Sequence, residues 1–157
     1  MSLIARIMEA ARNMAADREL AGERVDRSRS ALMSRVRCKN TKPELVVRRE
    51  VHALGYRFRL HRSDLPGTPD LVFPRLRKIV FVHGCFWHRH EGCSRTTTPT
   101  TRATYWQKKF EQNVLRDRRN VTMLEALGWK VLVIWECETS DRSKLTEALS
   151  SFLASPR

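Results

Sequence analysis

The segment that most restricts how this chain can fold is KIVFVHGCFWHRHEGC, residues 78–93. It begins as a run of β-forming apolar residues and continues into two cysteines and three histidines. In a reducing compartment, cysteine and histidine at this density indicate a metal site rather than disulfides. The fold must therefore bring any further ligand, from a distant part of the chain, to the end of this strand.

The candidate ligands outnumber the places in one zinc site. Zinc takes a tetrahedral set of sulfur and nitrogen donors at about 2.0–2.3 Å, and a short loop can supply two or three of them. A cysteine just after a later apolar run is a good distant ligand, because its thiol can project from the end of a strand. The five candidates for four places are Cys85, His88, His90, Cys93 and Cys137. One of the two histidines is therefore left for other work.

The charge of the chain predicts a polyanionic partner. The 157 residues include 30 Lys and Arg against 17 Asp and Glu, which gives a net charge of +13. Arginine supplies planar, bidentate donors for phosphate, so we expect nucleic acid rather than an acidic membrane surface. The sequence has no apolar run of about 18 residues and no signal-peptide core, which predicts a cytoplasmic protein that does not span a membrane.

The spacing of apolar and turn residues predicts an α/β fold with a mixed central sheet flanked by helices. Thr41 to Glu44 has the form of a capping box, which starts a helix that ends at Gly55. The nearly continuous apolar run over 130–135 predicts a central strand buried on both faces. Further predictions are strands over 56–60, 70–73 and 78–82, helices over 103–127 and 141–153, an extension (helix-prone or flexible) over 1–27 and one domain over 28–157.

Asp70 is a second candidate for metal chemistry. It stands in GTPDLVF, after a Gly/Pro loop and at the start of an apolar strand. A carboxylate at a strand end supplies the hard oxygen ligand that Mg²⁺ prefers. Mg²⁺ can neutralise charge on both the attacking and the leaving oxygen during phosphodiester hydrolysis. An aspartate before a strand is more often a turn residue. The prediction of a metal ligand therefore depends in part on the basic charge of the chain, which indicates that a phosphodiester binds nearby.

A Pro-Asp pair beside adjacent strands resembles the restriction-endonuclease-like nucleases, but the usual Glu-x-Lys on the next strand is absent. Within that superfamily the chain resembles the very-short-patch (Vsr) mismatch repair endonucleases over about residues 27–154. The motifs that carry this resemblance are RSALMSRVR, TPDLVF, FVHGCFWHRHEGC, YWQKKFEQNVLRDRR and GWKVLVIWEC.

The resemblance implies a role for each matching residue. Asp70 and the backbone carbonyl of Val82 would bind Mg²⁺, His88 would be the general base, and His83 would lie near the scissile phosphate. Glu44 would orient water beside the metal. The implied zinc ligands are Cys85, His90, Cys93 and Cys137. Phe86 and Trp87 would insert beside the mispaired base, and Met33 would insert from the opposite side.

The implied activity is Mg²⁺-dependent nicking of one DNA strand 5′ of the T in T·G mispairs, which arise when 5-methylcytosine deaminates. Implied partners are mismatch-repair proteins and a cognate cytosine-5 methyltransferase. An asymmetric mispair needs only a monomer. Two alternatives remain at this point. The chain is a non-catalytic zinc-containing DNA-binding module, or its zinc is catalytic with His88 as a ligand and an open position for water.

Overall fold

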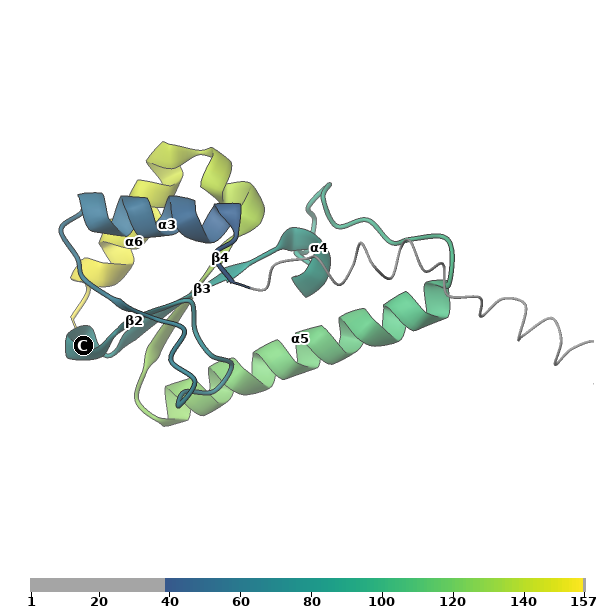
Figure 1. Ribbon diagram of the computed structural model, residues 1–157, viewed down its shortest axis with the longest axis horizontal. Coiled ribbons are helices and arrows are strands. Elements are labelled where there is room, and N and C mark those ends of the chain that lie inside the picture. Colours follow the sequence, from purple (N-terminus) through teal and green to yellow (C-terminus); the bar gives the residue numbers. More distant parts are fainter. Residues whose placement is uncertain (1–38, 157) are drawn as a thin grey trace, which may run out of the picture. The chain divides into compact units, whose positions relative to one another are not determined.

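The computed structural model describes residues 39–156 (Figure 1). Met33 and the predicted extension over 1–27 lie outside these residues, so the predictions made for them stay predictions. Among the described residues, no helix is long and apolar enough to span a membrane. The helices and strands are α3 (Lys42–Ala53), β1 (Arg59–Leu60), β2 (Leu71–Phe73), β3 (Lys78–His83), α4 (Cys85–His88), α5 (Ala103–Ala126), β4 (Lys130–Trp135) and α6 (Arg142–Ala154), with 3₁₀ turns η1 (Pro74–Leu76) and η2 (Glu136–Ser140).

The strands form one mixed sheet in the order β1-β2-β3-β4. β2 and β3 form an antiparallel hairpin, with Leu71 opposite Val80. β4 runs parallel to β3, with Val82 opposite Ile134, and the long helix α5 makes the crossover between them. The predicted α/β class with a mixed sheet between helices is therefore confirmed.

Helices cover both faces of the sheet. Figure 1 shows α3 and α6 together on one face and α5 on the other. Alternate residues of β3 supply the two cores: Val80 packs with α3 and α6, whereas Ile79 and Phe81 pack with Leu124 of α5. This division follows from the period of two along a strand, which sends successive side chains to opposite faces.

The helix boundaries follow local chemistry. Thr41 and Glu44 form the predicted capping box of α3, and Gly55 follows its end with φ +85°, a left-handed conformation that glycine adopts without steric cost. The predicted long helix and final helix are present as α5 and α6, and Asp141 caps the latter. Residues 85–88, which we expected in a loop, form the short helix α4.

Two strand predictions were wrong. The strand expected over 56–60 is reduced to Arg59–Leu60, because its partner β2 is only three residues long and Pro74 follows it. Among the strands that the structure describes, β4 lies at the edge of the sheet rather than at its centre, and Ile134 is the only buried residue of β4.

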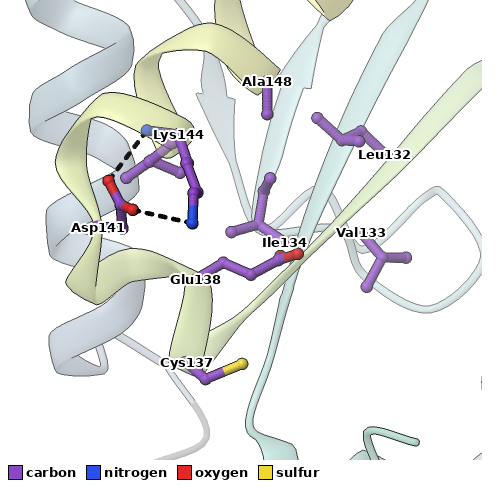
Figure 2. A pocket seen from close by; sticks show the side chains of 9 residues that line it. Leu132, Val133, Ile134, Cys137, Glu138, Asp141, Lys144 and Ala148 are labelled. Atoms are coloured by element: carbon purple, nitrogen blue, oxygen red, sulfur yellow. Dashed lines mark hydrogen bonds and ion pairs between the residues drawn. The ribbon is translucent and has the colours of Figure 1, made fainter. Parts of the chain in front are cut away.

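A pocket of about 390 Å³ lies beside β4, between this strand and α6. Figure 2 shows Leu132 and Ile134 on its strand side and Asp141 bonded to Lys144 on its helix side. The apolar run of β4 therefore faces a partly open hollow where the sequence predicted full burial.

Candidate active site and metal centre

The candidate catalytic and metal-binding residues lie at one end of the sheet. Asp70 directly precedes β2, His83 ends β3, and Cys137 follows β4. Because β2 is antiparallel to β3 and β3 is parallel to β4, the start of β2 and the ends of β3 and β4 meet at the same end. The fold thus assembles residues that are far apart in sequence.

Four side chains form a group that can hold a metal ion. One donor atom from each of Cys85, His90, Cys93 and Cys137 lies within 4.8 Å of the others. His90 Nδ1 is 3.7 Å from Cys85 Sγ and 3.2 Å from Cys137 Sγ. A tetrahedral zinc site with bonds of about 2.0–2.3 Å places neighbouring donors about 3.6 Å apart. Three thiols and one imidazole at these separations fit zinc.

The electrostatics of this group favour a bound cation. Burial raises the pKa of the Cys85 thiol to about 12, so the thiolate form needs a compensating positive charge. The pKa of the Cys93 thiol is lowered, and the main cause is a hydrogen bond from the backbone N–H of Arg95. A metal ion deprotonates its coordinating thiols and supplies the missing charge.

A second group lies beside the first and contains His88, the histidine left out of the cysteine cluster. His88 Nδ1 is 2.5 Å from Asp117 Oδ2, which comes from the middle of α5. The His88 ring stacks on the ring of His83 at 3.9 Å. Trp135 connects the two groups, because it stacks on His90 at 4.3 Å and meets His83 edge-on at 5.5 Å.

This arrangement defines the proton positions on His88. An ionised carboxylate only accepts hydrogen bonds, so Nδ1–H donates to Asp117 and Nε2 keeps a free lone pair. Burial raises the pKa of Asp117, but the hydrogen bond and charge of His88 outweigh it, so the pKa lies below its usual value. Burial, with the neighbouring His88, lowers the pKa of His83 to about 3, so His83 is neutral at neutral pH.

Asp70 lies in a third group with Glu44 and His61. Its Oδ2 accepts a hydrogen bond of 2.7 Å from the Val82 N–H, which fixes the carboxylate beside the end of β3. Burial is the main cause that raises the pKa of Asp70 to about 6. The charge of Glu44 acts in the same direction, whereas the hydrogen bond from Val82 and the charges of Arg48 and His88 lower the pKa. Two carboxylates held this close are hard oxygen donors that fit a divalent cation such as Mg²⁺.

Glu44 is buried and already engaged within the protein. Its oxygens accept hydrogen bonds from the backbone N–H of Asn40, from Thr41 and from the Arg48 guanidinium. The capping box therefore places a buried carboxylate at the first turn of α3, next to Asp70.

Phe86 and Trp87 lie half-buried in an aromatic group with Trp106 and Phe110 of α5. The Asn113 side chain donates a 3.0 Å hydrogen bond to the carbonyl of Trp87, which holds α4 against α5. Their insertion into DNA stays a prediction.

Sequence reasoning missed two residues. Asp117 is one of them: it contacts Arg116 at 3.4 Å, and its closer partner is His88. His61 is the other, and it lies between Glu44 and Asp70. No local pattern could have shown either contact, because both join segments that are separated in the chain.

The chain is similar to known DNA endonucleases. The family model of DNA mismatch endonuclease Vsr matches residues 24–95. The type II nicking enzyme V.XorIIP of Xanthomonas oryzae pv. oryzae is 54% identical over 125 residues, which cover 80% of this chain and 91% of that enzyme. V.NmeAIP of Neisseria meningitidis is 38% identical over 122 residues, which cover 78% of this chain and 86% of that enzyme. DNA mismatch endonuclease Vsr of Escherichia coli is 47% identical over 100 residues, which cover 63% of this chain and 64% of that enzyme.

Identity at this level over most of both chains shows common descent, and the mixed α/β fold agrees with the restriction-endonuclease-like architecture that the sequence predicted. The chain belongs to the Vsr family of DNA mismatch endonucleases.

Proposed function

We propose that this DNA endonuclease nicks one strand of duplex DNA 5′ of the T in a T·G mispair, by Mg²⁺-dependent hydrolysis with His88 as general base. The observation that carries the proposal is the position of His88. This histidine stands outside the cysteine cluster, is bonded to Asp117 through Nδ1, and lies in α4, which follows β3 at the same end of the sheet as Asp70. A base beside a carboxylate that fits a divalent cation is the arrangement that phosphodiester hydrolysis needs.

The residues around Asp70 supply the metal-binding part of this site. Asp70 and the carbonyl of Val82 hold Mg²⁺, and Glu44 orients nearby water. Mg²⁺, when bound, supplies positive charge next to the scissile phosphate. The hydrogen bond from the Val82 N–H keeps the Asp70 carboxylate in one orientation before substrate arrives.

His88 removes the proton from the attacking water. Its Nε2 is the free acceptor because Asp117 holds the proton on Nδ1, and Asp117 stabilises the imidazolium that forms. A neutral imidazole is the side chain most often used as a general base near neutral pH. His83, stacked on His88, stays neutral and lies near the phosphate.

Zinc has a structural role in this proposal. Cys85, His90, Cys93 and Cys137 hold it, so that α4 and the His88 on it are fixed relative to the sheet. Phe86, Trp87 and Met33 form the wedge that opens the duplex at the mispair. Mismatch-repair proteins and a cognate cytosine-5 methyltransferase are the proposed protein partners of a monomeric, cytoplasmic enzyme.

The test is nicking of end-labelled duplexes with Mg²⁺, using a T·G mispair, the other mispairs and a fully paired control in varied flanking sequence. We expect one strand of the T·G duplex to be cut 5′ of the T. Asp70→Ala should abolish cutting and largely retain binding. Binding of the T·G duplex by the wild type without any cutting would instead favour the non-catalytic zinc module.

A measurement of zinc content distinguishes the remaining alternative, a catalytic zinc with His88 as a ligand. We expect His88→Ala to keep its zinc and lose nicking, because His88 lies outside the group that fits the metal. Loss of zinc from His88→Ala would support the catalytic-zinc alternative.

A further inference from the structure

His61 occupies a place in the candidate Mg²⁺ site to which the proposed function gives no task. Its ring is mostly buried and lies between two carboxylates, with Nε2 3.7 Å from Glu44 Oε2 and Nδ1 3.9 Å from Asp70 Oδ1. The residue follows β1 directly and has φ +46°, a left-handed conformation that is uncommon for residues other than glycine. The fold therefore holds His61 here at a cost in backbone energy.

Arg48 determines which nitrogen of His61 carries the proton. The Arg48 Nη2 atom is 3.0 Å from His61 Nε2 and also donates to Glu44 at 2.8 Å. A guanidinium has only donors, so Nε2 must accept this hydrogen bond. The neutral ring then carries its proton on Nδ1, the nitrogen that faces Asp70.

Asp70 consequently has an N–H group near each of its oxygens. The Val82 N–H bonds Oδ2 at 2.7 Å, whereas His61 Nδ1 lies 3.9 Å from Oδ1, beyond hydrogen-bond distance but near enough for a small side-chain movement to join them. Direct coordination of a metal by His61 fits this geometry poorly. A metal on Nδ1 would put the ring proton on Nε2, where it would point at another donor, Arg48 Nη2.

We propose that His61, oriented by Arg48, is a positioning residue that aligns Asp70 for divalent-metal binding. Hydrogen bonds from such outer residues typically change metal affinity by about 10- to 100-fold when they are lost. This inference rests on the proposed function in one respect: Asp70 is taken as the metal ligand.

The tautomer provides a direct test that involves neither metal nor DNA. Long-range ¹H–¹⁵N spectra of the imidazole rings in the zinc-loaded, magnesium-free protein distinguish the two neutral forms, and His61→Gln identifies the signals of His61. We expect the proton on Nδ1 in the wild type and a shift toward the Nε2 form in Arg48→Met. A wild-type His61 protonated on Nε2 would overturn the inference.

Metal affinity provides the second test. Free Mn²⁺ measured by electron paramagnetic resonance gives the affinity of each variant, and Asp70→Ala gives the background. We expect His61→Ala to bind Mn²⁺ about 10-fold or more weakly. His61→Gln should stay within about threefold of the wild type, because its carboxamide can accept from Arg48 and donate to Asp70 at the same time.

Three results would overturn the inference. The first is an equal affinity for Mn²⁺ in His61→Ala and the wild type. The second is the absence of Asp70-dependent Mn²⁺ binding by the folded wild type. The third is a ¹⁴N coupling to bound Mn²⁺ that His61→Gln removes, because such a coupling would make His61 a metal ligand. Failure of the proposed function looks different. A wild type that binds Mn²⁺ with the expected dependence on His61 but cuts no T·G duplex would refute the nicking activity alone.

Discussion

At the scale of single residues, the contact between His88 and Asp117 gives the most direct prediction about nicking activity. Asp117→Asn keeps the size of the side chain but replaces an anion that only accepts with a neutral amide that can either accept or donate, so the proton of His88 is no longer confined to Nδ1. We expect the single-turnover nicking rate to fall about 10²- to 10⁴-fold, which is the usual contribution of a general base. Affinity for the T·G duplex and zinc content should stay unchanged.

The matched control for Asp117→Asn is Arg116→Gln, which removes the neighbouring charge and keeps the bond to His88. This control should cut DNA at nearly the wild-type rate. A wild-type rate in Asp117→Asn would show that the carboxylate has no part in the reaction.

The raised pKa of Asp70 implies an unusual dependence of the free energy of unfolding on pH. Its pKa is about 6 in the folded protein, against an ordinary value of 3.8, so the folded state binds the proton more tightly than the unfolded state does. The free energy of unfolding therefore decreases as the pH rises from about 4 to 6 and stays reduced above this range, by roughly 1–3 kcal/mol. Asp70→Asn, in magnesium-free buffer, should be more stable than the wild type at pH 7.5 by that amount and equally stable near pH 4.

Urea unfolding of both proteins at the two pH values measures this difference. Added Mg²⁺ should stabilise the wild type much more than Asp70→Asn, since the variant lacks the charged oxygen ligand of the proposed site. An Asn variant that is less stable than the wild type at pH 7.5 would contradict the prediction.

At the scale of elements, Lys78 joins the start of β3 to the end of α6. Its side chain is fully buried, and Nζ donates to the carbonyl of Leu153 at 3.0 Å and to that of Ser155 at 2.5 Å. Burial is the main cause that lowers the lysine pKa. Lys78→Met keeps the apolar volume but leaves these carbonyls without a donor, so we expect a loss of about 1–3 kcal/mol in the free energy of unfolding.

Lys130 offers a matched control, because it lies opposite Lys78 in the register of β3 and β4 and bonds the carbonyl of Pro156 from an exposed position. Lys130→Met should change the free energy of unfolding by about 0.5 kcal/mol or less. Equal urea midpoints for the two variants would show that the buried lysine does not hold α6.

Local sequence predicted those elements whose boundaries are chemically marked. The capping box and Gly55 define α3, and Gly128, with φ +79°, follows the end of α5. The sequence could not show that β4 is an edge strand. A continuous apolar run indicates burial against neighbours but does not specify whether the cover is a strand or, as here, helices and an open pocket.

At the scale of the whole molecule, the cysteine and histidine cluster connects α4 to the segment after β4. Cys85 and His90 lie around α4, whereas Cys137 lies in η2, so a bound zinc joins two segments that the backbone leaves separate. A metal that binds only the folded state stabilises it by about 4 kcal/mol when its concentration is 1,000 times the dissociation constant. Loss of zinc should therefore unfold this end of the sheet first.

His90→Ala tests this connection, with His52→Ala on the exposed side of α3 as the control. Metal analysis should find about one zinc per chain in the wild type and the control and substantially less in His90→Ala, whose thermal unfolding temperature should fall by several degrees. Full zinc content in His90→Ala would show that the metal is held by other residues.

The sequence by itself determined the local chemistry: which residues are available as soft and hard ligands, where α3 begins, and which family motifs the chain carries. It also left one histidine over from five candidate ligands for four places. The tertiary structure decided the partners: that Asp117 of α5 bonds His88, and that Arg48 contacts His61, which lies beside Asp70. The physical reason is that ligand type and capping depend on neighbours along the chain. A hydrogen-bond partner, by contrast, depends on the register of strands and the packing of helices, which is set only when the whole core forms.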